Sequence, residues 1–388
     1  MYLRERVKNF IKLEVFSSVL LIFSLMLALI LSNSPLNDAY MLMQKIPIQF
    51  SIGTFHLNKP AIIWLNEGLM ALFFLLLTIE AKFHCLEGAF QSSGVFRLPI
   101  LGAIGGAIVP PIIYIMMTNH LPSAQSGWAI PIATDTAFVL GVLAFFSNKI
   151  SLTVRLFIVA LSIIDDFIAI MLLALFFSDH MQITPLLLGL GVVGILYLMN
   201  RNNCKKLALY MMMGVLLWLC LIHSGIHGTI TGVILGLFIP LRVQNEDIRV
   251  YSPLKSLERN LHPFVAYILL PTFAFLNGGI DLSQMNLWDV TSPISMGIIC
   301  GLFFGKQIGI MAFTYVGVKM KYVTLPGNIS WATYYGIAIL CGIGFTFSIF
   351  IGLLSFDQAA YINQMKIGVI LASFLSTLAG VLVLRFSR

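Results

Sequence analysis

Long apolar runs separated by short polar segments extend over almost the whole chain. A membrane-spanning helix needs about 20 mostly apolar residues. By this measure the sequence predicts twelve spans, at residues 14–33, 61–82, 98–118, 124–147, 154–177, 184–200, 206–222, 226–240, 261–280, 293–317, 330–354 and 363–385. The first run is too long for a signal-peptide core and lacks a small-residue cleavage site, so we interpret it as a retained span. The pattern therefore predicts an all-α polytopic membrane protein, with residues 1–388 forming a single membrane domain.

The composition excludes the other broad classes. Hydrophobic residues make up 59% of the chain and charged residues only 10%, whereas a soluble domain carries about 25% charged residues. A chain so rich in apolar side chains is not disordered either. The five cysteines lie far apart and form neither a disulfide framework nor a CxxC metal site.

Basic residues predict the orientation, because cytoplasmic loops retain lysine and arginine. With a cytoplasmic N-terminus, 19 of the 23 basic residues fall in inner segments and only Lys45 and Lys59 in outer ones. Lys306 and Lys366 fall inside apolar runs. Both termini are therefore predicted to be cytoplasmic. The net charge of +7 reflects this loop bias toward anionic lipid, and we expect no nucleic-acid partner.

One segment outside the predicted spans has the alternation of a β-hairpin. Between residues 46 and 58, apolar residues alternate roughly with polar ones around a Gly-Thr pair, at Ile48, Phe50, Ile52, Phe55 and Leu57. Such alternation around a glycine-containing turn favours two antiparallel strands. An irregular loop is the alternative interpretation.

Four ionisable residues fall near the middle of predicted spans. Asp135 lies in span four, Asp165 and Asp166 in span five, and Lys306 in span ten. Charges at this depth are costly and mark functional sites by default. Three acids against one base suit a proton or cation site better than an ion pair that only locks helices. Adjacent residues on a helix point about 100° apart, so we expect one of the paired acids to face a cavity while the other pairs with Lys306.

Two of the predicted spans contain helix-breaking residues at their centres. Pro131 lies in span four, and Gly342 and Gly344 lie in span eleven. Interrupted helices are tolerated at membrane depth where they line a cavity, and corresponding broken helices in two halves indicate a transporter's binding site. We therefore predict discontinuous helices at spans four and eleven, within inverted repeats formed by spans 3–5 and 10–12.

Buried carboxylates bind both hard cations and protons, so the two compete for one site. If only a loaded site changes sides, the result is obligatory exchange, and more than one proton per monovalent cation makes it electrogenic. A passive cation channel is one alternative, although no filter segment is visible. An intramembrane enzyme with paired aspartates is the other, although Asp165 and Asp166 lack a Gly-x-Gly-Asp or DDxxD context. We expect no enzyme and no cofactor.

At these residues the chain resembles the NhaA family of Na⁺/H⁺ antiporters of bacterial inner membranes. The resemblance rests on the runs PIATDTAFVLGVLAFF, LSIIDDFIAI, HSGIHGTITGVILGLFIPL, FGKQIGI, CGIGFTFSIF, GAIGGAIVPPIIY and LHPFVAYILLPTFAFLNGG. It implies binding of Na⁺ and protons at Asp165 and Asp166, with Thr134 and Asp135 in the broken fourth span and Lys306 beside the acids. All five are therefore candidate ion- or proton-binding residues. It also implies Na⁺ or Li⁺ efflux against protons, activation at alkaline pH, and a homodimer joined through the outer hairpin.

The resemblance further implies a group of residues that respond to pH. Glu80 and Glu258 match acidic positions of the family's cytoplasmic funnel, and Lys255 matches a basic one. The chain departs from the family at His84, where a second glutamate is common, and imidazole titrates near neutrality with the opposite charge. His227, at the start of span eight, is a further candidate from its residue type alone, against a role as a polar residue at a helix end.

Overall fold

The computed structural model describes residues 2–52, 55–87, 93–144, 152–176, 182–244, 250–284, 286–325 and 329–387. Their contacts divide the chain into two compact units. The first unit comprises Met1–Asn33, Ala89–Ala169 and Asn277–Arg388. The second unit comprises Ser34–Gly88 and Ile170–Leu276.

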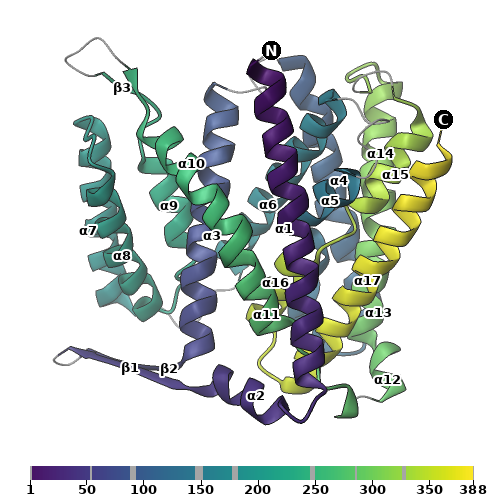
Figure 1. Ribbon diagram of the computed structural model, residues 1–388, viewed down its shortest axis with the longest axis horizontal. Helices are drawn as coiled ribbons and strands as arrows, with labels where there is room; N and C mark the ends of the chain where they lie inside the picture. The colour runs from purple at the N-terminus through teal and green to yellow at the C-terminus, as the bar shows by residue number, and fades with distance from the viewer. Residues whose placement is uncertain are drawn as a thin grey trace. The chain divides into compact units, whose positions relative to one another are not determined.

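The first unit is entirely helical in its described residues (Figure 1). Its elements are α1 (Tyr2–Ser32), α4 (Ser93–Thr118), η2 (Pro122–Ile132), α5 (Thr136–Ala144), most of α6 (Leu152–Phe176), η4 (Leu282–Gln284), α12 (Leu287–Val290), α13 (Pro293–Ile299), η5 (Cys300–Gly305), α14 (Lys306–Lys319), α15 (Trp331–Leu340), α16 (Phe345–Ser355) and α17 (Ala359–Phe386). Here η2 is a 3₁₀ helix, and η5 is a π-helical turn that continues α13 into α14.

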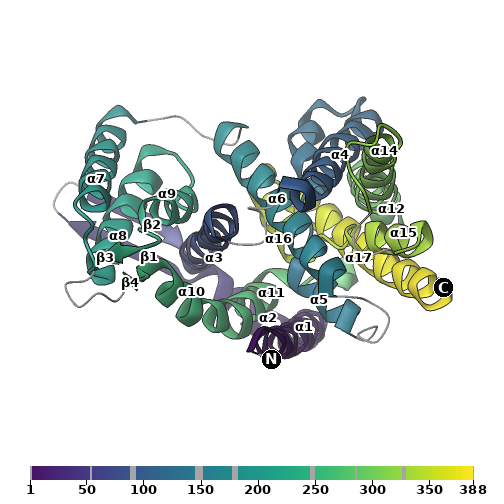
Figure 2. The same cartoon turned by 90° about the horizontal axis from the view of Figure 1, so that it is seen from above.

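The second unit adds short strands to its helices. Its elements are α2 (Asn37–Lys45), β1 (Pro47–Ile52), β2 (Phe55–Pro60), α3 (Ala61–Leu86), α7 (Ile183–Arg201), α8 (Leu207–Ser224), α9 (Ile230–Phe238), β3 (Val243–Gln244), β4 (Val250–Tyr251), α10 (Pro253–Phe264), η3 (Val265–Leu269) and α11 (Leu270–Gly278). Figure 2 shows α9 between α3 and the α7–α8 pair.

The predicted class of mostly helical, multi-pass protein with broken helices is confirmed. Among the described residues, seven helices are long and apolar enough to cross a membrane, and up to ten do so if each bent helix pair counts as one span. The pairs η2–α5 and α15–α16 bend by 45° and 43°, so the discontinuous fourth and eleventh spans are present. The count of twelve stays a prediction, because α6, with its three charged residues, and the nine-residue α9 are not among these spans. The inverted-repeat relation also stays a prediction.

The predicted hairpin is present, with β1 and β2 antiparallel and in a register that pairs Pro47 with Pro60 and Ile52 with Phe55. Residues 53 and 54, the expected turn, lie outside the described residues. The structure also contains elements that the sequence analysis did not predict, namely α2, the two-residue strands β3 and β4, and α12.

Glycines set the closest helix contacts. Helices α4 and α14 lie side by side in both views (Figures 1 and 2). A Cβ atom on Gly105 would lie 2.1 Å from the carbonyl oxygen of Gly309, and one on Gly309 would lie 2.1 Å from that of Gly105. In the second unit, a Cβ on Gly232 would lie 2.0 Å from the oxygen of Ala71, where α9 meets α3. No larger residue fits these backbone crossings.

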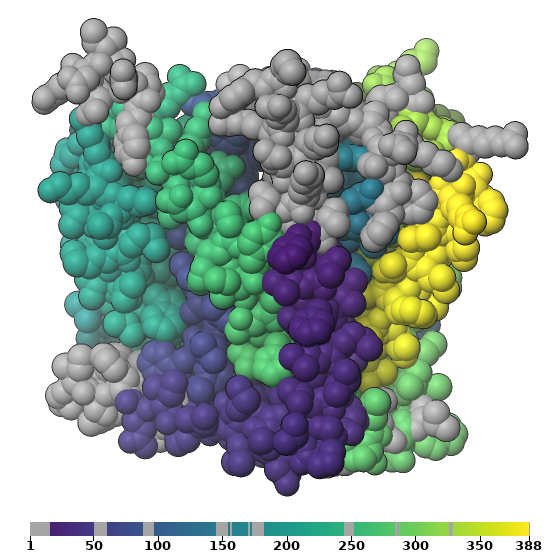
Figure 3. Space-filling model, viewed as in Figure 1, coloured from purple at the N-terminus to yellow at the C-terminus, as the bar shows by residue number. Residues whose placement is uncertain are grey.

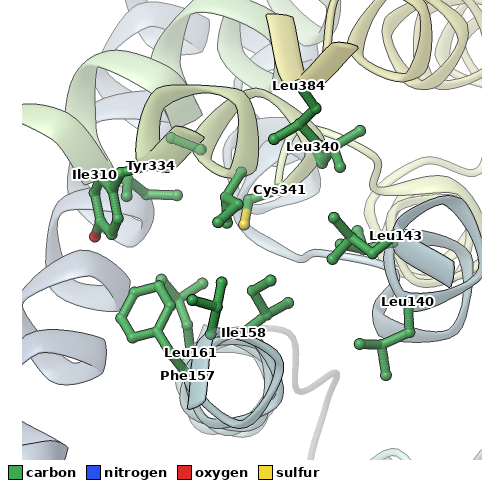
Figure 4. Packing of buried hydrophobic residues seen from close by; sticks show 14 of the residues in the cluster. Leu140, Leu143, Phe157, Ile158, Leu161, Ile310, Tyr334, Leu340, Cys341 and Leu384 are labelled. Carbon is green, nitrogen blue, oxygen red and sulfur yellow. The ribbon is translucent and has the colours of Figure 1, made fainter. Parts of the chain in front are cut away.

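The core of the first unit surrounds the break in the eleventh span (Figure 4). Cys341, in that break, is fully buried. It packs among side chains of α5, α6, α14, α15 and α17: Leu140, Leu143, Phe157, Ile158, Leu161, Ile310, Tyr334, Leu340 and Leu384. By contrast, the outer side of α1, purple in Figure 3, exposes large apolar side chains such as Phe23 (61%) and Ile30 (60%). An exposed apolar face of this extent suits contact with lipid.

Candidate functional site

The two helix breaks of the first unit lie against each other and are connected by hydrogen bonds. The amide of Asp135 donates to the carbonyl oxygen of Ile343 at 2.6 Å. The hydroxyl of Thr134 lies 2.9 Å from the carbonyl oxygen of Cys341. Backbone groups that lack helical hydrogen bonds at one break are therefore partly hydrogen-bonded by residues of the other break. Buried backbone groups in a membrane require such partners.

Local sequence explains why the chain breaks here. Pro131 has no amide hydrogen to continue a regular helix, and Ala133 is already extended, with φ −78° and ψ 149°. On the other side, a Cβ on Gly342 would lie 2.5 Å from the carbonyl oxygen of Leu302. A Cβ on Gly344 would lie 2.2 Å from the Ser348 hydroxyl. The glycines thus permit the close approach of neighbouring groups at the second break.

A buried ion pair lies beside these two breaks. Lys306 Nζ donates to Oδ2 of Asp165, and both side chains have no exposed surface. The Thr134 hydroxyl lies 2.9 Å from the same oxygen. Of the two adjacent acids, the structure thus pairs Asp165 with Lys306, and it brings Thr134 to the same atom. Asp165 Oδ1 is also buried and has no hydrogen-bond partner among the described residues.

Asp166 follows on α6 and is 2% exposed. No three histidine, cysteine, aspartate or glutamate side chains within the described residues form a metal-binding cluster. A cation held by Asp165 and Asp166 would therefore need further oxygen ligands, such as hydroxyl or carbonyl groups, because alkali cations prefer several hard oxygen donors.

Asp135 takes a different place from the paired acids. Its Oδ1 accepts from the amide of Phe138 in the first turn of α5, at 3.2 Å. Its Oδ2 accepts from the amide and the hydroxyl of Thr346 in the first turn of α16, at 3.1 and 2.6 Å. One carboxylate therefore caps the N-termini of two half-helices, where their dipoles favour negative charge.

The predicted pH-response residues all belong to the second unit. Glu80 Oε1 lies 3.9 Å from His262 Nε2. Lys255 donates to Oε2 of Glu87 at 2.9 Å and lies over the Phe83 ring, 4.7 Å from its centroid. His84 lies half-buried on α3, His227 in the turn before α9, and Glu258 on α10.

Sequence reasoning missed Glu87, which ends α3 and also accepts from Arg242. Hydrogen bonds from Lys255 and Arg242 hold the pKa of the Glu87 carboxyl below its ordinary value. The sequence gives only a weak signal for Glu87, because charged residues just outside a membrane span are common. The backbone oxygens of Cys341 and Ile343 were missed as well, since carbonyl groups carry no residue-type signal.

Comparison with known proteins found similarity to Na⁺/H⁺ antiporters over nearly the whole chain. A family described as Na⁺/H⁺ antiporter 1 matches residues 8–384. The Na(+)/H(+) antiporter NhaA of Tolumonas auensis is 42% identical over 98% of this chain and 95% of that protein. The Na(+)/H(+) antiporter NhaA of Pseudomonas putida strain GB-1 is 42% identical over 97% and 96%. A solved structure of the sodium proton antiporter MjNhaP1 from Methanocaldococcus jannaschii shares the fold, with TM-score 0.51 and 14% identity, over 100% of this chain and 99% of that chain.

Proposed function

Because this chain belongs to the Na⁺/H⁺ antiporter 1 family, we propose that it exchanges Na⁺ for H⁺ at Asp165 and Asp166, beside the two helix breaks. Membership of a transporter family also means that the protein is not an enzyme. The observation that carries the proposed site is the ion pair of Asp165 with Lys306, fully buried next to both breaks.

The ion pair suggests how the two ions exclude each other. With no cation bound, the Lys306 ammonium neutralises Asp165, and neither side chain has exposed surface. A cation at the paired acids supplies the same positive charge, so Lys306 is then free to separate from Asp165. Protons taken up by the carboxylates would likewise remove the negative charge that attracts the cation. Because the acids are adjacent, their protonation is coupled and belongs to the pair.

Thr134 assists at the same oxygen. Its hydroxyl has one proton and lies within hydrogen-bond distance of both Asp165 Oδ2 and the carbonyl of Cys341. It can donate to only one of them at a time. A change in the charge of Asp165 would therefore change which oxygen accepts from the Thr134 hydroxyl. If the hydroxyl turns from Asp165 to the Cys341 carbonyl, the hydrogen bonding at the break of the eleventh span changes too.

The finer properties are part of the same proposal. We propose that Li⁺ is also carried, and that more than one proton enters per cation, which makes exchange electrogenic. We also propose activation at alkaline pH, a bacterial inner-membrane location with both termini cytoplasmic, and a homodimer joined through β1 and β2. For the pH response we propose Glu80, His84, His227, Lys255 and Glu258.

The central test is ion-driven proton movement in everted membrane vesicles. We expect Na⁺ and Li⁺, but not K⁺, to release protons from acidified vesicles, as measured by acridine-orange fluorescence. Asp165→Asn and Asp166→Asn should abolish the signal, whereas Asp357→Asn, an exposed acid between α16 and α17, should leave it intact. Na⁺ flux without proton movement would instead support a channel, and full exchange in both site variants would contradict the proposed site.

Electrogenicity and pH response need separate measurements. In proteoliposomes, clamping the membrane potential with K⁺ and valinomycin should change the exchange rate, because each net charge gains about 2.3 kcal/mol per 100 mV. A rate independent of potential would show electroneutral exchange. His84→Gln should shift the pH at half-maximal rate without abolishing exchange, and an unchanged pH profile would remove His84 from the proposed group.

A further inference from the structure

A buried hydroxyl on α6 lies one helical turn before the paired acids and is not used by the mechanism above. Ser162 has no exposed surface. Its Oγ has no hydrogen-bond partner among the described residues. Most buried side-chain hydroxyls are hydrogen-bonded, because leaving one unpaired is costly.

Several other hydroxyls in the helices of this protein donate to the backbone carbonyl four residues earlier in their own helix, as at Thr78, Thr118, Ser355 and Thr377. This local bond is a common choice for a hydroxyl inside a helix. Among the described residues Ser162 makes no such bond, so its oxygen remains available to another partner.

The spacing places that oxygen on the acidic face of α6. Residues three and four positions apart lie on the same side of a helix, and Asp165 and Asp166 follow Ser162 by three and four residues. Asp165 Oδ1 is buried without a hydrogen-bond partner among the described residues, as the Ser162 Oγ is. Two unsatisfied oxygens therefore lie one turn apart on one face of α6.

We propose that the Ser162 hydroxyl is a direct ligand of the transported cation, together with the carboxylates of Asp165 and Asp166. This inference rests on the proposed function and adds a third ligand to its site. Two carboxylates alone leave most of the coordination of a hard cation unfilled. A neutral hydroxyl adds an oxygen without adding negative charge. When protons replace the cation, the same hydroxyl can hydrogen-bond the protonated acids.

The test compares the Na⁺ dependence of exchange in variants of Ser162 with a matched control. Ser162→Ala should raise the Na⁺ concentration for half-maximal exchange by roughly three- to ten-fold, the effect of one neutral oxygen contact, with the maximal rate and thermal stability near those of the parent. Ser162→Thr keeps the hydroxyl and should stay near the parent. Ser162→Cys keeps the size but offers sulfur, a poor ligand for Na⁺, and should resemble Ser162→Ala.

The control is Ser373→Ala, which removes another buried hydroxyl without a hydrogen-bond partner in the described chain, on α17. It should leave the Na⁺ dependence unchanged. An unaltered Na⁺ dependence in both Ser162→Ala and Ser162→Cys would overturn the inference, as would equal weakening by Ser373→Ala. Loss of exchange in Asp166→Asn, measured in parallel, would support the proposed function whether or not the Ser162 variants change the Na⁺ dependence. Retained exchange in Asp166→Asn would contradict the proposed function itself.

Discussion

Asp135 is expected to stabilise the fold as a shared helix cap, without being a cation ligand. It is only 4% exposed. One of its oxygens accepts from the Phe138 amide and the other from the Thr346 amide and hydroxyl. The two acceptors serve the first turns of α5 and α16, so one side chain holds both broken helices. Replacing it should therefore change stability first and transport second.

The size of the effect follows from the contacts. Loss of an N-terminal cap costs about 1 kcal/mol per helix, within a range of about 0.5–2 kcal/mol. A buried donor left without an acceptor costs about 1–3 kcal/mol. For Asp135→Ala, which removes both caps, we expect a loss of about 2–4 kcal/mol in the free energy of unfolding. Asp135→Asn keeps one carbonyl oxygen and can cap only one helix end, so we expect a loss of about 1–2 kcal/mol.

The assay measures unfolding in mixed detergent micelles and exchange in everted vesicles on the same variants. The expected order of stability is parent, then Asp135→Asn, then Asp135→Ala. Asp135→Asn should retain Na⁺-driven proton movement, whereas Asp166→Asn should lose it at near-parental stability. The reasoning would be refuted if Asp135→Asn unfolded like the parent yet lost exchange as completely as Asp166→Asn, because Asp135 would then act as an ion-binding residue.

The sequence predicts those features of the fold that depend on the membrane. Hydrocarbon thickness dictates the length of each apolar run, so the helices could be located from hydropathy alone. A proline or paired glycines inside such a run predict an interruption, and both breaks are present. Charges at mid-depth stand out for the same reason, so hydropathy alone marks Asp135, Asp165 and Lys306 as candidate site residues.

Contacts between helices could not be predicted in the same way. Which of Asp165 and Asp166 pairs with Lys306 depends on the rotation of α6 about its axis, since adjacent residues differ by about 100°. The role of Asp135 depends on α16, which lies about 210 residues later in the chain. The start of α10 was predictable in principle, because Ser252 caps it and Pro253 occupies its first position, a known start signal.

Three further predictions concern the buried ion pair of Lys306 and Asp165, the close contact of α4 with α14, and the ion pairs of Glu87. Lys306→Met should destabilise the protein by about 3–5 kcal/mol, because it leaves Asp165 charged, buried and unpaired, and the added change Asp165→Asn should restore most of that loss in mixed-micelle unfolding. Gly309→Ala should lower stability by about 1–3 kcal/mol through overpacking against α4. Gly191→Ala, with no atom within 4 Å of its Cβ, should be neutral or raise stability by up to about 1 kcal/mol, because alanine favours a helix over glycine. Equal effects of the two changes would contradict the close contact of α4 with α14. Glu87→Gln tests the ion pairs of Glu87 with Lys255 and Arg242. Lys255 and Arg242 lower the pKa of the Glu87 carboxyl. The two ion pairs therefore stabilise the fold at any pH above the ordinary pKa of a glutamate. This stabilisation is lost as the pH falls through the lowered pKa of Glu87. The difference in thermal stability between parent and variant should therefore be constant from about pH 6 to 8 and close in acid below about pH 4. A difference that changed instead between neutral and alkaline pH would show that Glu87 titrates with the activation of transport.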